Sequence, residues 1–355
     1  MDYLHAVRNS RISITRFFVI PLLALLIFSR CELFQKNVLN SSNKKLASTI
    51  TKNPAEHSNC TYARAVPIRK NQKPIWVPSF PGSGAELFRE LMTTVTSQAT
   101  IDGALIGECQ PGKFVTCKTH WPTLNYTKRF QDPLPNSKQF SSDVIVLLRN
   151  PINSIPSWYN QIYEERVKAE FHSTQAPESS WNRWIQLRST LRERMALWKE
   201  MIVYWARIDQ DPQAHYTVSH WIPYEKLVSN STGPRILSDV GTTLKKQGAP
   251  VSDDITCLWR YIVEERRGMK RGEHKYVPLY LSEHKTIFLE ELDSTIQAIK
   301  ELGAKSSKKV SVNAKYANLM RTLQSYRNDI DQSFHLRVVN NNVTKRSATT
   351  KKGKA

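Results

Sequence analysis

The feature that most constrains the fold of this chain is a strand, a tight turn and a helix start in residues 75–95. A short apolar run beginning at Ile75 leads into the turn Pro81–Gly84. The apolar residues beyond the turn recur at the spacing of one helix face, and they are Leu87, Phe88, Leu91, Met92 and Val95. Glycines let the backbone approach an anion closely, and the N–H groups and dipole of a helix N-terminus favour negative charge there. The segment therefore predicts a phosphate-binding loop in an α/β protein.

Two further apolar runs end in polar side chains. Residues 144–148 read as a fully buried parallel strand that ends at Arg149, and Ser157 follows eight residues later. Residues 114–117 read as a strand that ends in Lys118 and His120, which alternate by two and so project from one face of an extended chain. Arginine can bind phosphate through two hydrogen bonds. Because open α/β sheets bind ligands at the carboxyl ends of their strands, we expect these side chains to share a site.

These three segments together resemble the sulfotransferase superfamily. The resemblance lies in a Pro-x-Ser-Gly loop, a Lys-Thr-His-x-Pro strand end, and an Arg with a Ser eight residues later. It covers roughly residues 73–302, with weaker matches at Tyr224–Leu227 and Lys270–Gly272. Members of the family transfer a sulfuryl group from 3′-phosphoadenosine 5′-phosphosulfate (PAPS) to a hydroxyl or amine. The resemblance implies a P-loop-like, three-layer α/β fold, with a central parallel sheet flanked by helices.

The resemblance also implies a role for each matching residue. His120 is the expected general base, with Glu108 or Glu164 as the alternative, and Lys118 is expected to offset charge on the bridging oxygen. Arg149 and Ser157 are expected to hold the 3′-phosphate of the donor. The complete set of expected donor-binding residues is Pro81, Gly82, Ser83, Gly84, Ala85, Arg149, Ser157, Tyr224, Lys270, Arg271 and Gly272.

The chain departs from the family pattern at the start of the helix. Ala85, Glu86 and Leu87 stand where the family usually has two hydroxyl or amide residues and a Trp. The Glu86 carboxylate either repels the donor or points away and favours the helix N-terminus, and the sequence leaves both open. Gly82 also replaces a Lys or Arg that many soluble members carry, which we interpret as a subfamily trait. A catalytically inactive, sulfotransferase-like binding or scaffold protein is therefore the main alternative.

Several other function classes fit the sequence poorly. A P-loop kinase needs Gly-x-x-x-x-Gly-Lys-[Ser/Thr], and no Lys follows this loop. The cysteines lack zinc-ligand spacing, so we expect no metal. A type II glycosyltransferase is the least favoured alternative, because the Asp-x-Asp at Asp329 lies far from any predicted strand end.

The net charge is +20, and residues 304–355 carry half of it with twelve Lys or Arg against two Asp. We expect no nucleic-acid partner, because no nucleic-acid motif accompanies this charge.

The N-terminal region predicts entry into the secretory pathway. Residues 17–28 are uninterruptedly apolar and follow Arg8, Arg11 and Arg16, so we expect a signal anchor, although a cleaved signal peptide stays open. The predicted organisation is a cytosolic tail (1–16), an anchor (17–30), a lumenal stem (31–72), a catalytic domain (73–330) and a basic disordered tail (331–355). This organisation, together with the resemblance, implies a single-pass type II protein of the Golgi membrane. A carbohydrate or glycoprotein is the expected acceptor, and a protein tyrosine or a small alcohol stays open. Whether it forms oligomers stays open. Candidate glycosylation sites on the lumenal side are Asn40, Asn59, Asn125, Asn230 and Asn342.

Apolar periodicity predicts the remaining elements. One long helix is expected over 184–205, a second over 286–302 and a weaker third over 314–326, with another strand over 215–223. We interpret the tryptophans of the long helix as core residues. One or two disulfides are expected among Cys60, Cys109, Cys117 and Cys257, with the connectivity left open.

Overall fold

The protein is a three-layer α/β structure built on a parallel sheet. The computed structural model describes residues 60–102, 109–122, 139–170, 173–186, 188–265, 282–305 and 315–333. Its five strands pair in parallel in the order β2-β3-β1-β4-β5. They are β1 (Ile75–Pro78), β2 (Ile101–Asp102), β3 (Thr116–Thr119), β4 (Asp143–Leu148) and β5 (Thr217–Pro223). The predicted fold class, a parallel sheet flanked by helices, is confirmed at this level.

Strand β1 lies at the centre of the sheet between β3 and β4. Val77 pairs with Lys118 of β3, and Trp76 pairs with Val144 of β4. Successive side chains of a strand point to opposite faces, so Trp76 and Val77 contribute to different cores. The sheet is therefore apolar on both faces, as a parallel sheet covered on both sides by helices requires.

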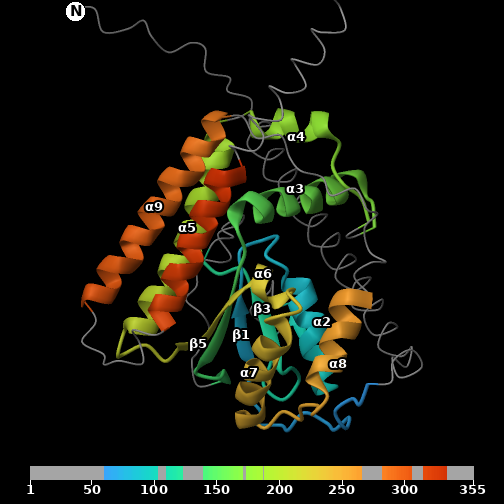
Figure 1. Ribbon diagram of the computed structural model, residues 1–355. Helices are drawn as coiled ribbons and strands as arrows, with labels where there is room; N and C mark the ends of the chain where they lie inside the picture. Colours follow the sequence, from blue (N-terminus) through green and yellow to red (C-terminus); the bar gives the residue numbers. More distant parts are fainter. Residues whose placement is uncertain are drawn as a thin grey trace, which may run out of the picture. The chain divides into compact units, whose positions relative to one another are not determined.

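One face of the sheet is covered by helices α2 (Ala85–Thr96), α7 (Gly233–Lys246) and α8 (Ile255–Arg260). Their apolar residues pack with Ile75, Val77 and Ile145 in one cluster of buried side chains. A short π-helical turn, η5 (Tyr261–Glu265), continues α8. These helices lie on the opposite side of the sheet from α5 and α9 (Figure 1).

The other face is covered by helices α3 (Pro151–Val167), α4 (Glu178–Ile185), α5 (Arg188–Gln210) and α9 (Ser282–Lys305), together with a helix over residues 315–333. Trp198 and Trp205 of α5 are fully buried against this face, which confirms their interpretation as core residues. The prediction of one helix over 184–205 is wrong in one respect. Trp184 belongs to α4, because that helix ends at Ile185 and α5 starts at Arg188.

The other elements expected from periodicity are present. Helix α9 covers the range predicted at 286–302, and residues 315–333 extend the weaker helix predicted at 314–326. The strand predicted over 215–223 is β5. Sequence patterns missed β2, because a strand of two residues is too short to show any alternation.

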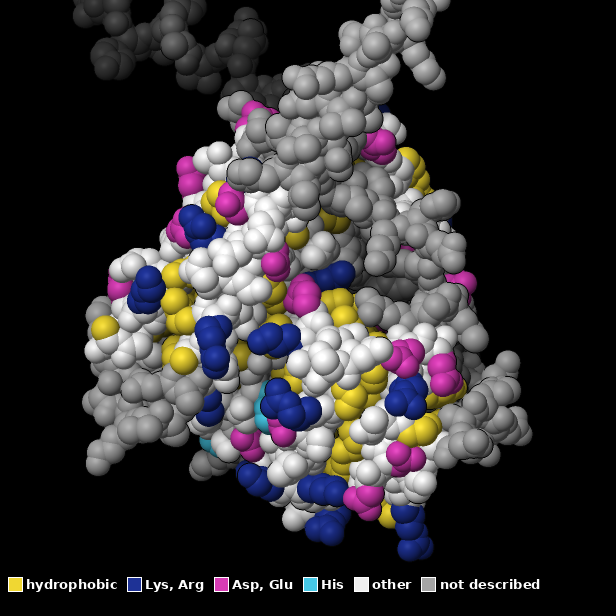
Figure 2. Space-filling view, in the orientation of Figure 1, with side chains coloured by type: hydrophobic (Ala, Val, Ile, Leu, Met, Phe, Trp, Pro, Cys, Tyr) yellow, Lys and Arg dark blue, Asp and Glu magenta, His cyan; other side chains and the backbone are white. Residues whose placement is uncertain are grey.

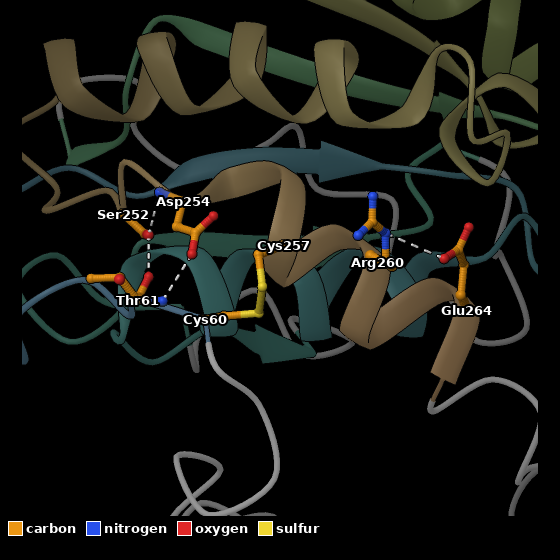
Figure 3. The surroundings of a disulfide bond; sticks show 7 residues. All are labelled: Cys60, Thr61, Ser252, Asp254, Cys257, Arg260 and Glu264. Atoms are coloured by element: carbon orange, nitrogen blue, oxygen red, sulfur yellow. Dashed lines mark hydrogen bonds and ion pairs between the residues drawn. A yellow bond between two sulfur atoms is a disulfide. The ribbon is translucent and has the colours of Figure 1, made fainter.

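Two disulfides join all four cysteines of the described chain. Cys109 pairs with Cys117, and Cys60 pairs with Cys257 at the start of α8. Figure 3 shows hydrogen bonds beside the second disulfide, where the Thr61 N–H donates to Asp254 and the Ser252 hydroxyl donates to the Thr61 carbonyl. Residues 60–72 therefore pack against the domain that follows them. The predicted boundary between stem and domain at residue 72 stays a prediction.

The features predicted for the chain ends lie outside the described residues. These are the apolar run at 17–28, most of the stem and the basic tail beyond residue 333. Within the part of the chain that the structure describes, none of the helices is both long enough and apolar enough to cross a bilayer. On the face in Figure 2, Lys and Arg side chains lie interspersed with Asp and Glu.

The two disulfides should differ in their contribution to stability. The Cys60–Cys257 bond spans 197 residues and the Cys109–Cys117 bond spans eight. A disulfide that closes a longer loop removes more entropy from the unfolded chain, so the expected losses are about 5 and about 2.5 kcal/mol. We expect Cys60→Ser/Cys257→Ser to lower the free energy of unfolding more than Cys109→Ser/Cys117→Ser does. Urea denaturation of the two double variants checks this, and equal losses would contradict it.

Candidate functional site

The predicted site segments meet at one edge of the sheet. Ser79 follows β1, His120 follows β3, Arg149 follows β4, and Tyr224 follows β5 at the start of α6 (Tyr224–Leu227). Because these four strands are parallel and adjacent, their carboxyl ends lie side by side. The connections from β1 and β4 leave for opposite faces, β1 to α2 and β4 to α3. Such a divergence between neighbouring strands opens the crevice in which α/β sheets bind ligands.

The turn after β1 depends on two glycines with positive φ. Gly82 has φ 79°, and a Cβ atom added there would lie 2.2 Å from the Ser154 carbonyl oxygen of α3. Gly84 has φ 87°, and a Cβ atom there would lie 2.3 Å from the Tyr224 ring. Side chains at these positions would be both strained and blocked. The glycines therefore allow the turn to pack directly against α3 and α6.

The turn presents groups that suit an anion. Gly84 is the N-cap of α2, and no side chain caps this helix N-terminus. Ser83 is 1% exposed, and within the described chain its Oγ atom has no hydrogen-bond partner. Buried hydroxyls normally have a partner, so this one fits a ligand bound in the turn. Pro81 and Ala85, which flank this region, are both buried.

Arg149 and Ser157 lie against the same turn. The Arg149 Nη1 atom donates to the Gly82 carbonyl oxygen at 2.6 Å, and the guanidinium lies 4.4 Å from the centre of the Tyr224 ring. The Cβ of Ser157 would be 3.1 Å from a Cβ on Gly82. The structure thus brings together Gly82, Arg149, Ser157 and Tyr224, although they come from four different segments.

Lys118 reaches the first turn of α2 from the neighbouring strand. It is 8% exposed, and its Nζ atom lies 2.9 Å from the Glu86 Oε1 atom. Arg89, one turn further along α2, pairs with the other carboxylate oxygen of Glu86 at 2.5 Å. The carboxylate that the sequence left ambiguous is therefore paired with two cations.

The charge state of Glu86 follows from these contacts. Burial by itself would raise the pKa of its carboxyl, but the Lys118 ammonium and the Arg89 guanidinium together lower that pKa from 4.5 to about 2. Glu86 is therefore ionised at any physiological pH. A carboxylate so weakly basic is a poor acceptor for a proton.

His120 makes a contact that selects its tautomer. Its Nδ1 atom lies 2.6 Å from the Ser79 carbonyl oxygen. A carbonyl oxygen only accepts hydrogen bonds, so Nδ1 carries the proton and donates it. In the neutral ring the basic lone pair is then on Nε2. A backbone contact of this kind orients the imidazole and leaves Nε2 as the nitrogen that can accept a proton.

The remaining predicted residues either lie outside the described part of the chain or have another contact. Lys270, Arg271, Gly272 and Glu108 lie outside the described residues. Glu164, the other alternative base, is 1% exposed in the second half of α3, where its Oε1 atom accepts from the Thr174 N–H at 2.8 Å. Its hydrogen bond holds the segment after α3.

Sequence reasoning missed three residues that support the site. Ser79 contacts His120, Arg89 pairs with Glu86, and Glu225 accepts a hydrogen bond from the Asn150 N–H at 2.9 Å. The sequence could have indicated Glu225 as a site residue, because it belongs to the Tyr-Glu-x-Leu segment that follows β5. No sequence pattern indicates Ser79 or Arg89. Each contacts a site residue only in the folded chain, Ser79 through His120 and Arg89 through Glu86.

A separate open groove lies elsewhere on the domain. None of the predicted site residues lines it. Its lining consists of Val66, Pro67, Arg69, Gln98, Lys245 and residues 248–251. We therefore assign the candidate site to the strand ends where the sequence motifs meet, and not to this groove.

Comparisons of the chain with protein-family models, with curated proteins and with solved structures give no match.

The Glu86 ion pairs should make stability depend on pH. A carboxyl whose pKa is lowered on folding stabilises the protein above its ordinary pKa, and this contribution is lost as the pH falls toward the folded value. We expect Glu86→Gln to destabilise the protein by about 1–3 kcal/mol at pH 7, because the substitution removes the negative charge that pairs with Lys118 and Arg89. The difference from the wild type should shrink as the pH falls from 4.5 toward 2.

Urea denaturation at a series of pH values measures this difference. Glu290→Gln is the matched control, because Glu290 pairs with Arg192 on the surface, where both side chains are more than half exposed. Exposed pairs contribute less than about 1 kcal/mol, so the control should show a small and flat difference. A Glu86→Gln difference that stays constant with pH would contradict the ion-pair explanation.

Proposed function

We propose that this protein is a PAPS-dependent sulfotransferase with a P-loop-like fold. The observation that carries the proposal is the gathering of four segments at one sheet edge. The glycine turn, Arg149 and Tyr224 form one contact group, while Lys118 and His120 reach the same region from β3. The central position of β1, which leads into the turn and α2, supports the P-loop-like assignment.

The donor has two phosphate ends, and the site offers a separate group for each. The turn Pro81–Ala85 with the N-terminus of α2 suits the 5′-phosphosulfate, because its N–H groups and the buried Ser83 hydroxyl can donate to oxygen. Arg149 and Ser157 suit the 3′-phosphate, and the ring of Tyr224 lies beside them. The contact with the 3′-phosphate is what would distinguish PAPS from ATP.

Transfer would proceed by in-line displacement at sulfur. The acceptor oxygen forms a bond to sulfur as the bond from sulfur to the bridging oxygen breaks, and adenosine 3′,5′-bisphosphate leaves. His120 takes the acceptor proton on Nε2, since Nδ1 already donates to Ser79. Lys118 offsets the negative charge that develops on the bridging oxygen. Glu86 keeps the Lys118 ammonium beside the turn and lowers the net positive charge there.

We further propose that the enzyme acts in the Golgi lumen, anchored by residues 17–30, on a carbohydrate or glycoprotein. Two disulfides that join all four described cysteines support an oxidising compartment. Alkaline extraction of membranes tests the anchor, and release of a soluble protein that begins after residue 30 would contradict it.

A catalytically inactive, donor-binding scaffold protein is the second candidate. The pairing of Lys118 with Glu86 favours this candidate, because the carboxylate neutralises the cation that catalysis needs. A wild type that binds nucleotide but transfers sulfate to no member of a broad acceptor panel would support it. The glycosyltransferase alternative gains no support, because Asp329 and Asp331 lie on the 315–333 helix, where Asp331 pairs with Lys285.

Nucleotide binding tests the identity of the donor. We expect adenosine 3′,5′-bisphosphate to bind more tightly than AMP, because Arg149 and Ser157 are assigned to the 3′-phosphate. Arg149→Ala should weaken binding of the bisphosphate about 10- to 100-fold, as a lost charged hydrogen bond costs about 1.5–3 kcal/mol. Calorimetry measures both affinities. Arg192→Ala, which removes an exposed arginine of α5, is the control and should change neither. Equal affinity of the wild type for both nucleotides would remove the basis for naming the donor.

Replacement of the base tests the chemistry. His120→Ala should lower the rate of sulfuryl transfer about 10²- to 10⁴-fold, the typical loss on removing a positioned base. It should leave bisphosphate affinity nearly unchanged, because the imidazole is assigned to the acceptor. Transfer from radiolabelled PAPS to a panel of glycans and peptides measures the rate.

His215→Ala is the matched control for this change. His215 also contacts a backbone carbonyl, that of Phe140, but it precedes β5 and so lies at the opposite edge of the sheet. It should retain normal transfer. Near-normal turnover in His120→Ala would show that the base is another residue. Glu108 is then the next to replace, because Glu164 is buried and holds the segment after α3.

A further inference from the structure

The strand end that carries Arg149 is held by several hydrogen bonds. The carbonyl oxygen of Arg149 accepts from the Trp198 Nε1 atom of α5 at 3.1 Å. The next N–H group, that of Asn150, donates to the Glu225 Oε1 atom at 2.9 Å. The Asn150 side chain accepts from the Ile152 N–H and so caps α3. The direction in which Arg149 leaves β4 therefore depends on how firmly Glu225 is held.

Glu225 is held from the C-terminal helix. The Tyr326 hydroxyl donates to the Glu225 Oε2 atom at 2.8 Å, and Tyr326 is 3% exposed. One turn further along the same helix, Asp329 accepts from the Asn150 Nδ2 atom at 3.4 Å. Residues 326 and 329 share a helix face. One face of the 315–333 helix therefore contacts the Asn150 side chain directly and is linked to the Asn150 N–H through Glu225.

Tyr326 acts only as a donor in this contact. Burial raises the pKa of its hydroxyl well above the ordinary value, and the Glu225 carboxylate raises it further. The hydroxyl therefore keeps its proton throughout the physiological range and donates it to the carboxylate. A hydrogen bond between a buried hydroxyl and a carboxylate is of the stronger, charge-assisted kind.

We propose that Tyr326 is a positioning residue for the nucleotide site. Its hydroxyl orients Glu225, Glu225 holds the Asn150 N–H, and this bond sets the direction of the strand end that presents Arg149. The proposal rests on the proposed function, because it assigns the ligand of Arg149 as the 3′-phosphate of the donor. It extends that function to a helix some hundred residues further along the chain than α6.

Tyr316 provides a matched control on the same helix. It is 6% exposed, and its hydroxyl donates to the Ala206 carbonyl oxygen of α5 at 2.5 Å. Tyr316→Phe and Tyr326→Phe therefore remove the same atom from the same helix, and each breaks the hydrogen bond that a buried tyrosine donates. Only the second change touches the chain of contacts that leads to Arg149.

The first measurement is the affinity of each full-length variant for adenosine 3′,5′-bisphosphate and for AMP. We expect Tyr326→Phe to weaken the bisphosphate about 3- to 10-fold and to change AMP less than about 2-fold, as loss of one hydrogen bond acting through a neighbour suggests. Tyr316→Phe should change neither affinity. Equal losses for both nucleotides, losses of the same size in both variants, or no loss in Tyr326→Phe would overturn the proposal.

The second measurement is hydrogen exchange of the Asn150 amide, which does not depend on any ligand. We expect faster exchange in Tyr326→Phe and unchanged exchange in Tyr316→Phe, since only the former loosens the acceptor of this amide. If the wild type fails to prefer the bisphosphate over AMP, the proposed function is wrong, and the exchange rates still decide whether Tyr326 positions the strand end. Equal exchange rates in both variants would reject that role.

Discussion

The structure depends on the parallel pairing of β1 with β4, whose connections leave for opposite faces of the sheet. This arrangement brings the turn after β1 against the first turns of α3, so that Gly82 touches α3 and accepts a hydrogen bond from Arg149. Two parallel strands that are far apart in the sequence are thereby coupled through one turn. A side chain at position 82 would separate them, since its Cβ would overlap the Ser154 carbonyl.

Charge at this edge is balanced locally. Lys118 and Arg89 face the single carboxylate of Glu86, and Arg149 is held by a backbone carbonyl and an aromatic ring. Such partners reduce the cost of keeping cations in a partly buried region without a ligand. They also hold the cations close to where an anion would bind. Under the proposed function, the donor would share Lys118 with Glu86.

The second half of the chain supports the site through the backbone. Trp198 of α5 donates to the Arg149 carbonyl. Glu225 accepts from the following amide, and Tyr326 donates to Glu225. The helices that carry Trp198 and Tyr326 therefore pack in the core and also make hydrogen bonds that lead to a strand end. Sequence periodicity detects the first of these roles, because buried apolar residues recur along a helix. Periodicity does not detect the hydrogen bonds to the strand end, because they depend on single polar side chains.

The sequence by itself determined strands β1, β3, β4 and β5, the glycine turn and the chemical groups at the strand ends. Apolar runs and the residues that end them are local features of the chain. It also marked Arg149, Lys118 and His120 by their places after those runs. Only the tertiary structure decided that Glu86 pairs with Lys118, that His120 donates to Ser79, and which cysteines are joined. These contacts join residues from different elements. Their formation depends on which strands become neighbours and on how the helices pack across them, and neither is encoded in any short segment.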